Sequence, residues 1–260
     1  MGELLLELLT EEIPARMQRQ ALDDLVRHLG EWLKAQRIEA ETLTGYVTPR
    51  RLTVIADGIP DKVRIDREEK RGPRVGAPQQ AVEGFLRSVG LLSISQCEKR
   101  STDRGEFYFA VLMQGGQSTD EVLPDLIYST LHDIEWPKSM RYPASSLRWV
   151  RPLNSVLCLL DGKVLKLPPE LGAVPVGRTT CGHRFLSKGE ITVADAADYL
   201  KKLNAAHVVL DWHERRNKIE TELKAKAAAE GLLLKEDQGL LDEVAGLVEY
   251  PVVLMGSIDA

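Results

Sequence analysis

The sequence predicts an α+β fold with mixed sheets and flanking helices. Short apolar runs typical of strands alternate irregularly with amphipathic segments typical of helices. Two apolar runs, at 155–160 and 163–167, flank Asp161-Gly162, which is a strong signal for a β-hairpin. Because a hairpin joins antiparallel strands, this pattern favours mixed sheets over a regular parallel α/β fold.

The chain begins with an apolar segment at 3–9 that should form a buried strand. A helix is expected after residues 10–14, because acidic side chains suit the positive end of a helix and proline suits its first turn. Apolar residues at helical spacing continue that helix. The apolar run at 51–56 predicts the next strand.

Residues 61–78 form a mixed-charge segment with few apolar residues, two glycines and two prolines. Such a composition buries little apolar surface, so we expect a mobile segment near 60–75, which would let region 1–260 divide into two lobes. The basic residues here that could form an arm are Lys70, Arg71 and Arg74. A solvated linker is the alternative.

The remaining elements alternate in the same irregular way. Helices are expected at 78–89, from Ser118 or Thr119 onward, at 194–203, after Asp211 and around 240–248, and strands at 106–113, 191–193, 208–210 and 250–255. Asp211 and Glu214 have the spacing of a capping box, and Gly90 and Gly231 should end the helices that precede them.

Composition limits the class of protein. A net charge of −5 excludes a wholly basic nucleic-acid coat but allows a local basic face. Three widely spaced cysteines indicate a reducing compartment, and no Cys/His cluster has the spacing of metal ligands. No apolar run reaches the ~18 residues of a membrane span, and the acidic N-terminus is unlike a secretory signal. We therefore expect a cytoplasmic protein with no membrane association and no structural metal.

The stretch from Trp136 to Pro152, WPKSMRYPASSLRWVRP, concentrates positive charge and contains no acid. Its cations and aromatic residues are Lys138, Arg141, Arg148, Arg151, Trp136, Tyr142 and Trp149. Cations pair with phosphates and flat rings stack on unpaired bases, so this stretch is a candidate nucleic-acid surface. The alternative is that the tryptophans hold a loop to the core while the cations are solvated.

Other candidate residues lie outside this stretch. Arg50 and Arg51 stand at the mouth of the strand at 51–56, where side chains can reach solvent. His183 and Arg184 lie in a segment that contains no acid. Cys181 could pair with His183 as nucleophile and base, but without a third orienting group this signal is weak. The GxxxxGK[ST], GxGxxG, GxSxG and HExxH motifs are absent.

Six segments form a recognisable set: LLLELLTEEIPAR, YVTPRRLTV, AVEGFLRSVG, WPKSMRY, TTCGHRF and DEVAGLVEYPVVLMG. In this order and spacing, along nearly the whole chain, they resemble the N-terminal part of the beta subunit of bacterial heterotetrameric glycyl-tRNA synthetase. The sequence departs from the family at Tyr142, where a tryptophan is expected, and at Ala260, beyond which the family continues. The resemblance implies an N-terminal fragment without the later HD-type and anticodon-binding domains.

The resemblance also implies a role. The alpha subunit would carry the active site, which uses ATP, Mg²⁺ and glycine, while this chain would bind no cofactor and would serve as a tRNA-binding and assembly region for tRNA(Gly). Its fold would be similar to the editing module of the phenylalanyl-tRNA synthetase beta subunit. No catalytic residue is expected. The candidates for tRNA contact, by motif position, are Arg50, Arg51, Lys138, Arg141, Arg148, Trp149, Arg151, His183 and Arg184.

Two alternative functions stay open at this point. A hydrolase that clears mischarged tRNA needs a water-activating group, and only the loop Gly182-His183-Arg184 offers one. A pocket for glycine excludes larger amino acids by size, so the need for editing is small. A scaffold that contacts only the alpha subunit would instead show an exposed apolar patch without a basic face.

Overall fold

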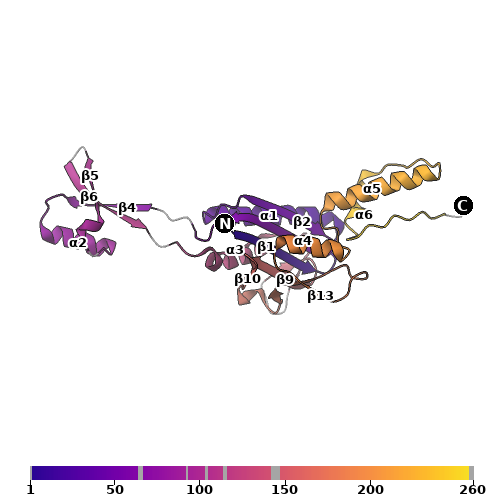
Figure 1. The fold of residues 1–260 in the computed structure, drawn as a ribbon, viewed down its shortest axis with the longest axis horizontal. Coiled ribbons are helices and arrows are strands. Elements are labelled where there is room, and N and C mark those ends of the chain that lie inside the picture. The colour runs from indigo at the N-terminus through magenta and orange to yellow at the C-terminus, as the bar shows by residue number, and fades with distance from the viewer. Residues whose placement is uncertain are drawn as a thin grey trace. The chain divides into compact units, whose positions relative to one another are not determined.

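The computed structural model describes residues 2–63, 67–91, 93–102, 105–113, 116–141 and 147–257. The chain forms two compact units (Figure 1). We call Met1–Asp61 with Ser118–Ala260 the large unit, and Lys62–Gln117 the small unit.

The large unit is built on a six-stranded sheet with β1 in its interior. The strands are β1 (Gly2–Thr10), β2 (Thr42–Thr48), β3 (Arg51–Ile59), β9 (Leu153–Leu160), β10 (Lys163–Val164) and β11 (Val176–Gly177). Antiparallel pairs give the order β10-β9-β1-β3-β2, and β11 joins β9 in parallel. The sheet is therefore mixed, as the sequence predicts.

Five helices and two short hairpins complete the described part of the large unit. The helices are α1 (Ala15–Ala35), α3 (Thr119–Asp133), α4 (Ala196–Ala205), α5 (Trp212–Ala229) and α6 (Gln238–Ala245), with a 3₁₀ turn, η2, at Pro169–Leu171. The small strand pairs are β7 (Met140–Arg141) with β8 (Arg148–Trp149), and β12 (Thr179–Cys181) with β13 (Glu190–Thr192). None of the described helices has the length and apolarity needed to cross a bilayer.

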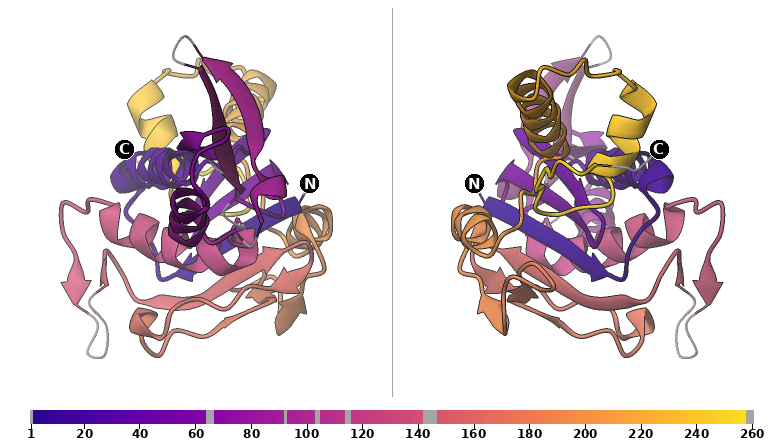
Figure 2. Two further views of the ribbon diagram at one scale, coloured as in Figure 1. Left: turned by 90° about the vertical axis from the view of Figure 1, so that its left-hand side faces the viewer. Right: turned by 90° about the vertical axis from the view of Figure 1, so that its right-hand side faces the viewer.

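One face of the sheet is covered by α1, which packs beside α3 (Figures 1 and 2). Leu6 of β1 is in register with Val54 of β3, and Val54 is in register with Gly45 of β2. Gly45 leaves room for α1, because a Cβ there would lie 2.6 Å from Val26. The apolar stripe of α1 is thus buried against the sheet, and each fully buried leucine contributes about 1.5–3 kcal/mol.

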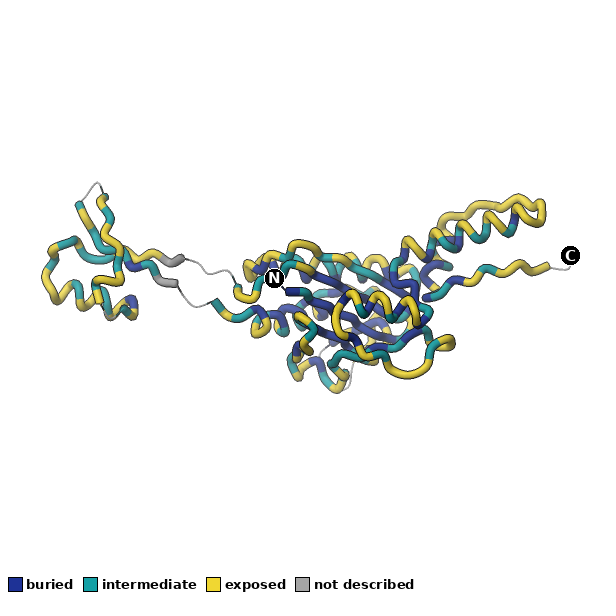
Figure 3. Tube along the Cα trace, in the orientation of Figure 1, coloured by how far each residue is buried: buried dark blue, intermediate teal, exposed yellow. Residues whose placement is uncertain are grey.

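The opposite face is covered by α4. Alternate residues of a strand point to opposite faces, so Leu5 lies on the other side from Leu6. Leu5 packs in one cluster with Tyr199 and Leu203 of α4. Figure 3 shows that the interior strands are buried over most of their length. Both faces of β1 are therefore inside the protein, which explains its nearly continuous apolar sequence.

The small unit is a three-stranded antiparallel sheet with one helix. Its strands are β4 (Arg67–Arg74), β5 (Glu98–Thr102) and β6 (Gly105–Met113), in the order β4-β6-β5. Its helix is α2 (Gln79–Val89), which contacts β4, and a 3₁₀ turn, η1, spans Ile94–Gln96.

Several local predictions are confirmed. Asp161 and Gly162 have φ of 51° and 69°, as the tight turn between β9 and β10 requires. The Asp211 carboxylate accepts a hydrogen bond from the Glu214 amide and caps α5. Gly90 ends α2 in the left-handed conformation. Each of these signals acts over a few residues, which is why the sequence reveals them.

Other predictions need correction. The strand β2 is missing from the sequence prediction, because Gly45 interrupts a pattern that has few apolar residues. The expected loop at 61–78 contains strand β4, which pairs with β6 through its backbone and needs no apolar pattern of its own. Residues 64–66 lie outside the described residues, and mobility near 60–75 stays a prediction.

The two strands predicted at 208–210 and 250–255 do not form in the described structure. Arg215 is the physical reason in the first case, since its guanidinium donates to the backbone oxygens of Val209 and Leu210. The amide of Val209 in turn donates to the Glu249 oxygen. These bonds satisfy the buried backbone without a strand ladder. Residues 250–255 pair with no strand, and three of their apolar side chains are exposed.

Candidate nucleic-acid interface

The cationic stretch folds into the hairpin β7–β8. Met140 pairs with Trp149, and Arg141 pairs with Arg148. Trp149 is fully buried, and Trp136 packs against it with the ring centroids 5.0 Å apart and the planes at 66°. The edge-to-face pair attaches the hairpin to the core. Tyr142 and the connection 142–146 lie outside the described residues.

Four cations of the hairpin and its flanks reach solvent. They are Lys138, Arg141, Arg148 and Arg151, and all are exposed. Within the described part of the chain, no carboxylate makes a salt bridge with any of them. Among the described residues, Arg151 donates a side-chain hydrogen bond to the neighbouring oxygen of Val150, at 3.2 Å.

The pairing of Arg141 with Arg148 places two like charges directly opposite each other. Like charges at opposed positions of a strand pair destabilise the pair. An anion bound between the two guanidinium groups would remove this repulsion, and a phosphate offers the matching geometry. The hairpin therefore has the charge and exposure of a phosphate-binding surface.

Arg51 and Trp149 do not belong to this surface. Both are fully buried, which excludes direct contact with a nucleic acid in this structure. Arg51 donates to Glu7 at 3.1 Å, to Glu249 at 2.9 Å and to the Cys181 oxygen at 3.2 Å. Its position at the start of a strand suggests exposure to solvent, but its partners come from distant parts of the chain. Glu7, Cys181 and Glu249 lie 44, 130 and 198 residues away in the sequence.

The buried arginine and its two glutamates form the centre of a polar network. Tyr199 donates to Glu7 at 2.5 Å, and Thr48 donates to Glu249 at 2.7 Å. Burial opposes the charge on Arg51, but Glu249 and Glu7 outweigh this effect and raise its pKa. Burial also disfavours the charged form of Glu249, yet Arg51 and Thr48 hold its pKa below the usual value. Arg51 and Glu249 therefore form a buried ion pair at the centre of a structural network.

Arg50, unlike Arg51, is not fully buried. It is half-buried in the turn between β2 and β3, where its amide donates to the Thr48 hydroxyl at 3.2 Å. Its backbone oxygen accepts a hydrogen bond from Thr10 at 2.8 Å. This residue stays a candidate for contact with a ligand, with part of its side chain at the surface.

The loop after β12 carries His183 and Arg184. The His183 Nδ1 atom accepts hydrogen bonds from the amides of Phe185 and Leu186, at 3.3 and 3.2 Å. This geometry leaves the proton of the neutral ring on Nε2, so the ring has no free acceptor for a water proton. Arg184 forms a salt bridge with Glu11 at 2.8 Å. Its charge is therefore already compensated within the chain.

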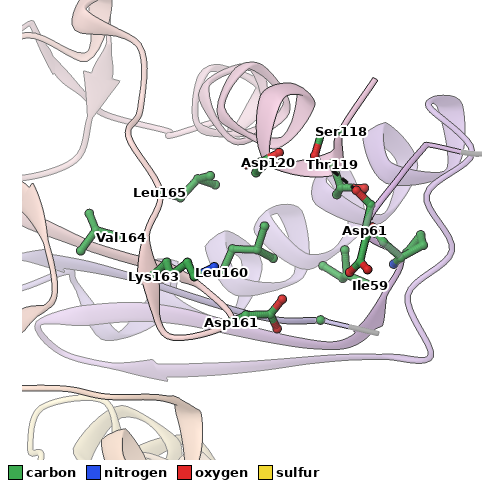
Figure 4. Close-up of a pocket in the computed structure, with 12 residues that line it drawn as sticks. Ile59, Asp61, Ser118, Thr119, Asp120, Leu160, Asp161, Lys163, Val164 and Leu165 are labelled. Atoms are coloured by element: carbon green, nitrogen blue, oxygen red, sulfur yellow. Dashed lines mark hydrogen bonds between the residues drawn. The ribbon is translucent and has the colours of Figure 1, made fainter. Parts of the chain in front are cut away.

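A cavity of about 310 Å³ lies between the β9–β10 turn and the start of α3 (Figure 4). Asp61, Asp120 and Asp161 line it, with Lys163 as its cation. Such an acidic lining disfavours phosphates. Among the described residues, no group of His, Cys, Asp or Glu has the arrangement of a metal site.

A second cavity, of about 380 Å³, is an apolar groove between α5 and α6. Ile219, Leu223 and Leu241 are among its lining residues. Exposed apolar side chains surround it, including Leu240 at 61% and Val252 at 65% exposure. Exposed apolar surface of this kind is typical of sites that contact another polypeptide, a ligand or a membrane.

Comparison with known proteins identifies the family that this chain resembles. A family model described as "Glycyl-tRNA synthetase beta subunit" matches residues 4–260. The glycine–tRNA ligase beta subunit of Rhodospirillum centenum is 47% identical over 281 residues, which cover 100% of this chain and 39% of the relative. The proteins of the same name from Ruegeria sp. and Phenylobacterium zucineum are 46% and 45% identical, with 100% of this chain and 38% of each relative covered. The chain thus spans about two-fifths of the length of these relatives.

Proposed function

The chain belongs to the glycyl-tRNA synthetase beta subunit family, and on that premise we propose that it is a tRNA-binding and assembly region of glycine–tRNA ligase. In this proposal it supports the ATP-dependent attachment of glycine to tRNA(Gly). The reaction takes place on an alpha subunit, which binds ATP and Mg²⁺ in the cytoplasm. The contribution of this chain is to hold tRNA and to pack against the rest of the enzyme.

The observation that carries the tRNA-binding part is the exposed charge on the β7–β8 hairpin. Four cations project from a short segment without a described carboxylate partner, in a chain whose net charge is −5. Tertiary structure holds them in place through the buried ring of Trp149. A fixed group of cations suits a folded RNA, whose phosphates are also fixed relative to one another.

The apolar groove between α5 and α6 supports the assembly part. A scaffold without a nucleic-acid role would show apolar surface and no basic face. This chain has both kinds of surface, at separate places on the large unit. The two surfaces favour a region that both binds tRNA and packs against another polypeptide.

Hydrolytic editing is the second candidate function, and the similarity to the phenylalanyl-tRNA synthetase editing module stays a prediction. The loop at His183 is the feature that could favour it. There the Nδ1 atom already accepts two backbone hydrogen bonds, and no described hydrogen bond joins the ring to Cys181. A base needs a free lone pair within reach of its water. We therefore place tRNA binding ahead of editing.

A charge reversal separates binding from catalysis. In the complete enzyme, Arg141→Glu is expected to raise the KM for tRNA(Gly) by about tenfold, since it removes a phosphate contact and adds repulsion. Glycine-dependent ATP–pyrophosphate exchange should be unchanged, because activation occurs on the alpha subunit. The purified chain alone should show no such exchange.

The measurement is steady-state charging with tRNA varied, beside the exchange assay on the same enzyme preparation. An unchanged KM for tRNA, with the variant correctly folded, would exclude this hairpin as a tRNA contact. Exchange activity by the isolated chain would contradict the proposal that glycine is activated on the alpha subunit.

A further inference from the structure

The small unit differs in charge from the rest of the chain. Residues 62–117 contain ten lysines and arginines against seven acids, a net charge of +3, while the whole chain carries −5. Its sheet has β6 in the middle, between β4 and β5. A basic unit within an acidic chain indicates a polyanionic partner for that unit.

One face of this sheet is covered by α2. Ala110 of β6 is fully buried. Gly72 of β4 has no side chain, and the ring of Phe85 from α2 occupies the space that a Cβ would need, at 2.4 Å. The helix therefore packs on the face of the sheet that contains these two residues.

The opposite face carries two phenylalanines from the middle strand. Because side chains alternate along a strand, Phe107 and Phe109 point away from the face of Ala110. Phe109 lies directly opposite Arg71 of β4, and Phe107 lies directly opposite Arg100 of β5. Directly opposed residues of an antiparallel pair share a face. Arginines from both edge strands thus flank the aromatic pair.

Each of these arginines leans over a ring. The Arg71 guanidinium carbon lies 3.9 Å from the centroid of Phe107, and that of Arg100 lies 5.3 Å from the centroid of Phe109. Arg100 is held in place by Glu69 at 2.9 Å and by Glu98 at 2.5 Å. Both rings are partly buried. The result is a layer of rings and guanidinium groups that is partly exposed to solvent.

A bulge adds a third arginine to the same face. The register of β4 shifts between Arg71 and Arg74, so that Arg74 lies directly opposite Phe107. Bulges re-aim side chains in this way. The Arg74 guanidinium approaches Gly105, where a Cβ would lie 2.5 Å from it and where φ is +113°. Gly105 therefore permits both the backbone conformation and the position of Arg74.

We propose that this aromatic–arginine face, formed by Phe107, Phe109, Arg71, Arg74 and Arg100, binds unpaired nucleotides of RNA. Bases stack on the layer of rings and guanidinium groups, and phosphates pair with Arg71 and Arg74. Stacking of bases on rings and arginine planes is the means by which proteins hold single-stranded RNA. The inference adds a second site to the proposed function, with single-stranded rather than folded RNA as its ligand.

The sequence contains a partial signal for this site. It identifies Arg71 and Arg74 as a basic arm, but it shows Phe107 and Phe109 only as apolar residues of a strand. The pairing of β4 with β6 brings the two groups together. A Phe-x-Phe pattern on a strand next to a basic segment is the signal that could have located it.

The test uses the chain of 260 residues and fluorescence anisotropy with a labelled single-stranded RNA of about ten uridines, within the size range of such sites. Wild type is expected to bind this strand more tightly than a hairpin duplex of equal length. Arg71→Glu should weaken binding by about tenfold or more. Phe107→Leu, which keeps an apolar side chain but removes the ring, should weaken it by about fivefold.

The matched control is Arg87→Glu, the same charge change at an exposed position of α2, on the covered side of the sheet. It should change affinity by less than about twofold. Thermal melts of all variants are the check that the unit stays folded. Equal losses for Arg71→Glu and Arg87→Glu, or displacement of the RNA by a polyglutamate peptide at equal charge, would overturn the inference.

A second control keeps this site distinct from the hairpin β7–β8. Arg148→Ala with Arg151→Ala should weaken binding of the uridine strand less than Arg71→Glu does. If that pair abolishes binding of the strand and Arg71→Glu does not, the aromatic–arginine face is not the site, and the proposed function is unaffected. If neither variant changes binding of the strand, the inference about the small unit is equally wrong.

Discussion

In the complete enzyme, replacing Arg148 and Arg151 by alanine is expected to weaken tRNA(Gly) binding and to flatten its salt dependence. Each phosphate contact contributes a slope of about −0.7 to −0.9 to log K against log salt concentration. The loss of two contacts should therefore reduce the slope by roughly 1.5 units. Both side chains are exposed, so the fold should not change. The measurement is tRNA titration at several salt concentrations.

The matched control removes two charges elsewhere on the large unit. Lys34→Ala with Lys201→Ala changes the net charge equally at exposed helical positions. This pair should leave the slope nearly unchanged, because contacts rather than total charge determine counterion release. The same slope for both pairs, or an unchanged affinity for the arginine pair, would show that these arginines do not contact tRNA. The scaffold interpretation would then replace the tRNA-binding one.

Arg51→Met is expected to lower the free energy of unfolding of the large unit by about 3–5 kcal/mol, because it leaves buried carboxylates without their counter-charge. Glu7 is fully buried and Glu249 is 4% exposed, so water cannot replace the arginine. Adding Glu7→Gln and Glu249→Gln to this variant should restore most of the loss, since the triple variant buries no unpaired charge.

Tryptophan fluorescence during urea unfolding measures this effect, since all four tryptophans lie in the large unit. Arg27→Ala is the control, because Arg27 forms an ion pair with Asp24 on the surface of α1. Exposed pairs contribute at most about 1 kcal/mol. A loss for Arg51→Met no larger than that of Arg27→Ala would show that the buried network does not stabilise the fold.

The same network predicts how stability depends on pH. The pKa of Glu249 in the folded chain is below its ordinary value of 4.5. A carboxyl group of this kind stabilises the fold above its unfolded pKa, and the contribution is lost as the pH falls through the folded value. The large unit should therefore lose stability on acidification below about pH 4.5. In Arg51→Met, burial without a partner raises the pKa of Glu249, so this contribution should reverse in sign.

The measurement is the urea midpoint of wild type and of Arg51→Met between about pH 3 and pH 7. We expect the pH dependence of the two proteins to differ in sign near the pKa of Glu249. Parallel pH profiles for wild type and Arg51→Met would mean that Glu249 does not sense the arginine. The comparison is independent of the absolute stability of either protein.

The elements that the sequence reveals are those with local causes. The turn at Asp161-Gly162 needs two residues with positive φ, and the cap at Asp211 needs an acceptor three residues before an amide. The elements it misses depend on distant partners. Strand β2 exists because β3 pairs with it, and the segment 208–210 is not a strand because Arg215 satisfies its backbone.

In the candidate site, too, the sequence reveals features with local causes and misses those that depend on distant partners. The sequence locates the cationic hairpin, because a run of charge without acids is visible in a short window. It cannot distinguish Arg148 from Arg51, since both precede apolar residues at the start of a strand. Among the described residues, the fold brings two carboxylates to Arg51 and none into an ion pair with Arg148.

By itself, the sequence determined the fold class, most helices, the β9–β10 hairpin and the family of this protein. The tertiary structure alone decided which cations face solvent, and it brought Arg71 of β4 to the rings of β6. The physical reason is the cost of burying charge. An arginine can enter the core only where distant residues supply counter-charges and acceptors, and for Arg51 those partners lie as far as 198 residues along the chain.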